Sequence, residues 1–212
     1  MKESKTVKTL ILYNTVSGYT QRYAEMLKER LSEDAVTLMP LKQFKPKALD
    51  PFDRVVFMSR VTNDTISGFK TVVKHAELFA EKYACIVAVG MAKPTAAQYR
   101  VIENANIPYK LKGIPLFVVR GGFDAQKLKG GDKLIIKMTV SRLMKAQSRS
   151  PEEMAMLNFL NAKTDKVDSQ NLQPVEQYLK SGIFQPPETA DDDSAAEPWI
   201  DLEDYMPKSS VE

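Results

Sequence analysis

The sequence has few of the residues that most often carry catalysis or bind metals. It contains one cysteine, Cys85, and one histidine, His75, which excludes an internal disulfide and a cysteine metal site. Cys85 lies in an apolar run and is predicted to be a buried strand residue. His75 lies in a strongly periodic stretch, which favours a structural or surface role over Ser-His or Cys-His catalysis. No other residue stands out as an obligatory acid, base or nucleophile.

The sequence also lacks an apolar run long enough to span a membrane, and residues 1–6 lack the apolar core of a signal peptide. With 43% hydrophobic and 27% charged residues, the 212-residue chain has the composition of a soluble globular protein that can bury a full core. We therefore expect a cytoplasmic protein of one domain with extensions. A peripheral membrane contact stays open.

Charge is distributed unevenly along the chain. Residues 186–212, the acidic tail, hold nine acidic residues and one lysine, a net charge of −8 within a total of +3, so residues 1–185 carry +11. Residues 126–149, the basic segment, hold seven Lys and Arg residues against Asp132. The basic segment lacks interleaved aromatic residues and any known binding motif, so no nucleic-acid partner is expected.

The acidic tail is rich in Pro and Asp, a composition that predicts disorder. Its charge complements that of the basic segment, −8 against +6, and Trp199 and Tyr205 could anchor a contact. We predict that the tail contacts the basic segment of the same or a neighbouring chain, through ion pairs that loosen as salt rises. A solvated tail without a fixed contact is the alternative.

Short apolar runs alternate with amphipathic stretches over the first 119 residues. Because buried parallel strands are short and continuously apolar, this alternation predicts an α/β fold with a flavodoxin-like, doubly wound, five-stranded parallel sheet of order 2-1-3-4-5. The domain is predicted over residues 1–185, with a cofactor at the switch point between the first and third strands. Strands are predicted at 9–13, 35–39, 54–58, 85–89 and 116–119, and helices at 20–31, 66–83 and 95–105. The 66–83 helix is predicted to face inward with Val72, Val73, Ala76, Phe79, Ala80 and Tyr83.

Residues 125–182 are predicted to form a helical extension after the fifth strand. Helices are expected at 133–147, at 150–161 with Ser150 as the cap, and at 172–181, ending at Gly182. The apolar residues of 133–147 lie on several faces, which leaves three interpretations open. This helix is the last crossover helix, buried against the sheet with snorkelling lysines, or it lies on a membrane surface, or it lines a quinone or porphyrin pocket.

The most informative segment is the hydroxyl-rich turn after the first strand. Thr15, Ser17 and Thr20 surround Gly18, where a helix is predicted to begin. A helix N-terminus presents unpaired N–H groups and the positive end of the helix dipole, and glycine lets the backbone turn closely around a phosphate. The turn holds no Lys or Arg, so it suits a phosphate monoester that stays bound rather than one that is transferred. The alternative is that Thr15 or Ser17 simply caps the helix.

The pattern Thr-x-Ser-Gly-x-Thr at residues 15–20 resembles the FMN phosphate loop of flavodoxins. Together with residues 119–124 (Val-Arg-Gly-Gly-Phe-Asp) and 132–138 (Asp-Lys-Leu-Ile-Ile-Lys-Met), it resembles the flavodoxin-domain family related to menaquinone-dependent protoporphyrinogen IX dehydrogenase. The likeness covers residues 7–182 and is specific in the loop and in 119–145. The family usually has small or glycine residues where this chain has Ser59 and Arg60.

The resemblance implies an FMN-binding oxidoreductase or electron-transfer protein, whose redox partner or small-molecule substrate it does not identify. The implied alternatives are a protoporphyrinogen IX dehydrogenase with a quinone acceptor, and a non-catalytic interaction module that keeps the fold. Arg60 is implied to pair with the anionic reduced flavin or a substrate carboxylate, unless it is a solvated charge. FMN would lie among three loops, at residues 15–20, at 59–64 after the third strand and at 90–94 after the fourth. The implied site residues are Thr15, Val16, Ser17, Gly18, Tyr19, Thr20, Arg60, Val61, Thr62, Asn63, Gly90, Met91, Ala92 and Lys93.

Overall fold

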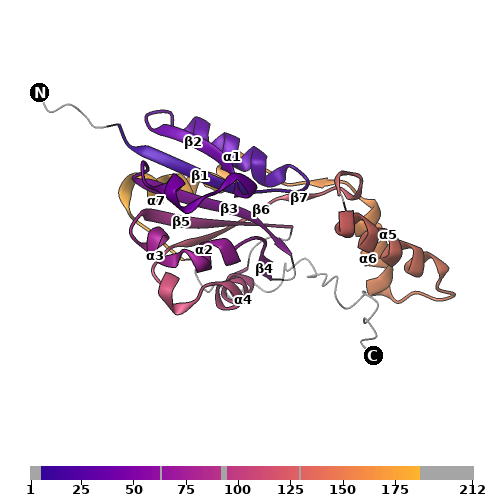
Figure 1. Ribbon diagram of the computed structural model, residues 1–212. Coiled ribbons are helices and arrows are strands. Elements are labelled where there is room, and N and C mark those ends of the chain that lie inside the picture. Colours follow the sequence, from indigo (N-terminus) through magenta and orange to yellow (C-terminus); the bar gives the residue numbers. More distant parts are fainter. Residues whose placement is uncertain (1–5, 63, 92–94, 129, 187–212) are drawn as a thin grey trace, which may run out of the picture.

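Parallel strands lie side by side at the centre of the computed structural model, which describes residues 6–62, 64–91, 95–128 and 130–186 (Figure 1). Within these residues the main path of the sheet is β2-β1-β3-β5-β6, and its four pairings are all parallel. The predicted order 2-1-3-4-5 is confirmed, because β5 and β6 are the fourth and fifth strands of that path. The five strands are β1 (Lys8–Asn14), β2 (Ala35–Pro40), β3 (Arg54–Thr62), β5 (Tyr83–Gly90) and β6 (Leu116–Arg120).

The central strands are buried on both faces. Leu10 and Leu12 of β1 belong to one apolar cluster and Ile11 to the other, and none of the three has exposed surface. A strand covered on both sides needs apolar residues at successive positions rather than at alternate ones. This is why continuous apolar runs located the strands in the sequence.

Helices form a layer on each side of the sheet (Figure 1). The first layer holds α1 (Tyr19–Arg30) and α7 (Gln173–Ser181), and the second holds α2 (Lys70–Lys74), α3 (Ala76–Ala80) and α4 (Ala96–Asn106). No helix in the described ranges is long and apolar enough to cross a membrane. Short 3-10 turns join the elements: η1 (Leu41–Gln43), η2 (Pro46–Leu49), η3 (Tyr109–Leu111), η4 (Ala125–Lys127) and η5 (Ser169–Leu172).

The single helix predicted over residues 66–83 is wrong. The chain first folds back on β3 as the short antiparallel strand β4 (Thr65–Ile66) and turns at Gly68, whose φ is 74°. It then forms α2 and α3, which are separated by His75 because its φ of −117° is not helical; the His75 ring packs edge-on against Phe44. Among the residues predicted to face inward, Val72, Ala76 and Phe79 are buried, whereas Val73 and Ala80 are exposed and Tyr83 begins β5.

Helices α5 (Gly130–Lys145) and α6 (Pro151–Asn161) form a pair that projects beyond one edge of the sheet (Figure 1). The interpretation of residues 133–147 as a crossover helix buried against the sheet is therefore wrong. One side of α5 packs on α6 and another stays exposed, which explains why its apolar residues lie on several faces; α7 covers the sheet instead. The predicted cap at Ser150 is confirmed. The third apolar cluster, here called the extension core, consists of Phe123, Leu128, Ile136, Leu143, Met156 and Leu160.

Tyr23 of α1 joins three parts of the structure. Its side chain is fully buried, and its hydroxyl donates a hydrogen bond to the carbonyl oxygen of Arg120 at the end of β6. The hydroxyl oxygen of Tyr23 also accepts hydrogen bonds from the side-chain amide of Asn171 at 2.7 Å and from the N–H of Asp168 at 3.3 Å. Burial raises the pKa of Tyr23, so the hydroxyl keeps its proton and its role as a donor at neutral pH.

We predict that Tyr23→Phe lowers the free energy of unfolding by about 1–3 kcal/mol, because it leaves buried polar groups without their partner. Tyr109→Phe is the matched control, since Tyr109 is 85% exposed, and it should leave stability unchanged. Urea unfolding of the three proteins measures both effects. Equal midpoints for Tyr23→Phe and the unmodified protein would contradict the proposed role of this hydroxyl.

Candidate functional site

The loop between β1 and α1 ends at an uncapped helix N-terminus. Gly18 occupies the N-cap position in a left-handed conformation, with φ of 90°, and no side chain caps the helix. The hydroxyl of Thr15 accepts a hydrogen bond from the N–H of Gly18 at 3.0 Å, which closes the loop on itself. The alternative that Thr15 or Ser17 caps α1 is therefore wrong, and the N–H groups of the first turn remain available to an anion.

The side chains around this N-terminus leave room for a ligand. Thr15, Val16 and Ser17 are half-buried, whereas Tyr19 and Thr20 are buried. A Cβ built on Gly18 would meet nothing within 4 Å, so the space beside the loop is open. A small acidic group could enter this space and accept from backbone N–H groups at the positive end of the helix dipole.

The register of the sheet brings the other two predicted loops to the same edge. Asn14 pairs with Ser59, Arg60 with Val89, and Gly90 with Arg120 across neighbouring strands. The carboxyl ends of parallel strands meet at the same edge of a sheet, so those of β1, β3 and β5 lie next to one another. Asn63, Ala92 and Lys93, which were also predicted to belong to the site, lie outside the described residues.

The predicted loop after the third strand is largely strand. β3 continues through Ser59, Arg60, Val61 and Thr62 before it folds back into β4. Of these residues, Ser59 is fully buried, Arg60 is half-buried, Val61 packs in a core cluster and Thr62 is exposed.

A hydrogen-bond network holds this end of β3 against β1. The Ser59 hydroxyl donates to the carbonyl oxygen of Ser67 at 2.5 Å and accepts from the Asn14 side-chain amide at 3.2 Å. The Asn14 amide also donates to the Ser67 carbonyl at 3.1 Å. The network therefore connects the start of the loop at residues 15–18 to the β3–β4 hairpin, so the two are held in one position.

The extension reaches this edge through the loop after β5. Gly90 is buried, and its carbonyl oxygen accepts from the N–H of Gly121 at 2.6 Å. Met91, the next residue, is partly buried and packs against the extension core. The predicted site loop and the helices α5 and α6 are thus in direct contact.

A two-stranded ribbon, absent from the sequence-based expectation, covers Tyr19. The ribbon pairs β7 (Gly122–Phe123) with β8 (Thr164–Asp165) in antiparallel fashion. The Tyr19 ring lies against Gly122, with the ammonium of Lys127 5.1 Å from the ring centroid. Arg22 and Asp165 fix the ribbon to α1 through an ion pair of 2.5 Å. The adjacent glycines 121 and 122 were the one signal in the sequence for this close approach.

Tyr19 itself is 3% exposed, and its hydroxyl has no hydrogen-bond partner among the described residues. Burial raises the pKa of this hydroxyl, and the carboxylates of Asp165 and Asp124 raise it further. The phenol is therefore neutral at physiological pH, and its hydroxyl is a buried donor beneath the ribbon. In the same described ranges, no group of three or more His, Cys, Asp or Glu residues could hold a metal ion.

Comparisons with known proteins point to one family. A family model described as a flavodoxin domain matches residues 10–150. The chain is similar to a solved flavodoxin of Fusobacterium nucleatum bound to flavin mononucleotide, with 14% identity over 58% of this chain and 75% of that one, and a TM-score of 0.39. It is also similar to the Trp repressor binding protein of Bacillus subtilis, with 15% identity, 66% and 99% coverage, and a TM-score of 0.36. No curated protein matches the chain.

The ribbon over Tyr19 gives a prediction about Gly122. A Cβ at this position would lie 2.4 Å from the Thr164 carbonyl oxygen and 2.6 Å from the Tyr19 ring. Gly122→Ala should therefore force the ribbon away from α1 and lower the free energy of unfolding by about 1–3 kcal/mol.

Gly131→Ala is the matched control, because a Cβ there meets nothing within 4 Å and the residue lies in α5. It should leave stability unchanged or raise it by up to about 1 kcal/mol, as expected for Gly→Ala in a helix. Thermal or urea unfolding separates the two variants. Equal stability of both would show that the ribbon does not pack on Tyr19 as described.

Proposed function

The chain belongs to the flavodoxin-domain family, whose model matches residues 10–150 of its 212, and from this membership we propose that it binds FMN and works as a flavin-dependent oxidoreductase or electron-transfer protein. The observation that carries the proposal is the uncapped N-terminus of α1 directly after β1. It lies where the strand order reverses between β1 and β3, the place at which doubly wound sheets bind their ligands. Both features depend on described residues only.

The phosphate of FMN fits the loop better than a transferable phosphate would. The loop offers backbone N–H groups and the hydroxyls of Thr15, Ser17 and Thr20, and it contains no Lys or Arg. The open space at Gly18 can take the phosphate. Bound FMN would supply the electron transfer, while the protein would set its position and redox potential.

The residues at the ends of β3 and β5 suit the isoalloxazine ring of FMN. Gly90 lets the backbone approach a flat ring closely, because it has no side chain and nothing fills the space where one would stand. Arg60, half-buried at the same edge, brings a positive charge that would stabilise a flavin gaining negative charge or a substrate carboxylate. Cys85 is not available as a nucleophile, since burial raises the pKa of its thiol.

We predict that the purified protein contains FMN or binds it on titration at micromolar concentration, as measured by the absorbance and fluorescence of the flavin. Gly18→Leu should abolish binding, because the side chain enters the phosphate space and the left-handed backbone disfavours it by about 1–2 kcal/mol. Gly18→Asn tolerates that backbone better and tests the steric effect separately. Gly131→Leu, at an exposed position of α5, is the control that should bind normally.

A protein that remains colourless and does not titrate with FMN would overturn the proposal. It would favour the alternative that the chain is a non-catalytic interaction module. Circular dichroism of each variant ensures that lost binding is not lost folding.

A second candidate is oxidation of protoporphyrinogen IX with a quinone acceptor, and the exposed apolar residues of the extension favour it. Leu134 and Met138 of α5 are 59% and 49% exposed on a helix pair that contacts the loop after β5. An apolar surface next to a flavin edge suits a lipophilic electron acceptor or substrate better than a water-soluble one.

We predict that Met138→Glu raises the KM for a quinone several-fold and leaves the rate with ferricyanide, a water-soluble acceptor, unchanged. Val101→Glu on α4 is the control, because Val101 is similarly exposed, at 47%, but lies outside the extension. Steady-state turnover with both acceptors measures the difference. Equal KM values in the two variants would remove the support for a lipophilic acceptor at α5, and the proposal of FMN binding would stand independently.

A further inference from the structure

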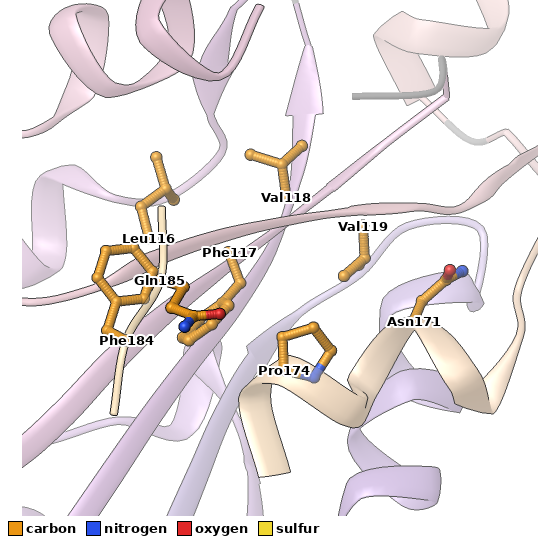
Figure 2. Close-up of a pocket in the computed structure, with 8 residues that line it drawn as sticks. All are labelled: Leu116, Phe117, Val118, Val119, Asn171, Pro174, Phe184 and Gln185. Carbon is orange, nitrogen blue, oxygen red and sulfur yellow. The ribbon is translucent and has the colours of Figure 1, made fainter. Parts of the chain in front are cut away.

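An apolar groove follows the outer edge of β6 (Figure 2). Its volume is about 200 Å³, and the residues that line it come from β6, η5, the start of α7 and the segment after α7. Figure 2 shows Phe184 and Gln185 beside Leu116 and Phe117, and Pro174 and Asn171 nearer to Val119. The groove runs along β6 from Leu116 to Val119, and its Phe184 end lies at the opposite end of the strand from Arg120.

The edge of β6 is open in the described part of the chain. β6 pairs with β5 on one side and ends the sheet on the other. Its sequence, Leu116-Phe-Val-Val119, is apolar, so the edge combines a strand side that pairs with no other strand and apolar side chains that are mostly buried. Edges of this kind are normally covered, because they otherwise pair with other chains.

We propose that the acidic tail docks in this groove and that the indole of Trp199 is its anchor. The described chain ends at Pro186, directly after Phe184 and Gln185, which themselves line the groove. The tail therefore starts at the rim of the site. It also holds the only tryptophan of the protein, next to Ile200 and followed by Leu202 and Tyr205.

The size and chemistry of the groove suit an indole. A cavity of roughly 150 Å³ lined by Leu, Ile and Phe already accommodates benzene, and this groove is larger and similarly apolar. The indole N–H needs an acceptor when it is buried, and an open strand edge offers backbone carbonyl oxygens. The tail would pair with the open side of β6, as an extended peptide does when it adds a strand to a sheet edge.

The segment that connects the groove to Trp199 is short. Residues 186–198 separate Gln185 from Trp199, and a flexible chain of that length has an end-to-end distance of roughly 20 Å. Linkers of this kind give effective concentrations in the millimolar range, so a weak apolar contact is enough to keep the tail docked. The tail carries −8 and residues 1–185 carry +11, so long-range attraction keeps the tail near the folded domain.

Because Trp199 is the only tryptophan, intrinsic fluorescence of the full chain reports directly on its environment. We expect emission shifted to shorter wavelength, and an acrylamide quenching constant several-fold smaller than that of N-acetyltryptophanamide. The protection should persist in about 1 M salt, where the Debye length is roughly 3 Å, because apolar burial drives the contact. It should also be independent of protein concentration, because the contact is within one chain.

Two variants locate the contact. Pro174→Glu places a carboxylate on the wall of the groove, in the first turn of α7 where an acidic residue suits the helix. It should repel the tail, move the Trp199 emission to longer wavelength and increase quenching several-fold. Gln173→Glu, an exposed neighbour outside the groove, carries the same charge change and should leave the emission unchanged. Ile200→Lys alters only the tail and should expose the indole without touching the folded domain.

Several outcomes would overturn the proposal. Quenching of the unmodified protein equal to that of N-acetyltryptophanamide would show that Trp199 is not buried. Equal spectra for Pro174→Glu and Gln173→Glu would exclude the groove, and protection lost in salt would place the tail on the basic segment instead. Protection lost on dilution would assign the contact to a second copy of the chain. Should Pro174→Glu fail to fold by circular dichroism, an unchanged spectrum of Ile200→Lys would still refute the anchor.

Discussion

The parallel pairing of β1 with β3 is the constraint on which the site depends. It sets Asn14 opposite Ser59, and the hydrogen bonds of both side chains to Ser67 hold the two strand ends together. Once this register is fixed, α1 must begin at the edge where β3 and β5 also end. The topology of the sheet then places the helix N-terminus, Arg60 and Gly90 at the same end of the strands. A one-residue slip would turn Ser59 away from Asn14 and place Met58 or Arg60 opposite it.

Most of the sheet could be predicted because its signal is local. Each central strand is a short apolar run, since it is buried on both faces, and the order of a doubly wound sheet follows from alternation with helices. The position of the loop at residues 15–20 could be predicted equally well, because a strand, hydroxyl residues, one glycine and a helical pattern follow one another in the sequence. The predicted strand order was right for this reason. The predicted loop at residues 59–64 was not, because polar residues such as Ser59 and Arg60 continue the strand when backbone pairing with β4 and β5 is available.

The parts that could not be predicted depend on contacts between distant residues. Gly122 pairs with Asp165 and Phe123 with Thr164, a separation of about forty residues, and each strand of this ribbon has only two residues. No periodicity exists over two residues. The helix predicted at 66–83 failed for a related reason: the apolar spacing of Val72, Ala76 and Phe79 is helical, but it does not reveal the break at His75. The placement of α5 on α6, rather than on the sheet, was likewise decided by tertiary packing that the sequence pattern did not specify.

The extension core is separate from the two clusters that pack on the sheet, and this separation has a thermodynamic consequence. A region with its own apolar cluster can open as its own cooperative unit, at a smaller free-energy cost than the unfolding of the whole domain. Amide hydrogens of α5 and α6 would then exchange with solvent through an opening that leaves β1, β3 and β5 closed. Met91 belongs to both regions, since it follows β5 in the chain and packs in the extension core. Each opening of the extension therefore releases one side of the loop at the sheet edge, and the local stability of the helix pair sets how often that edge is uncovered.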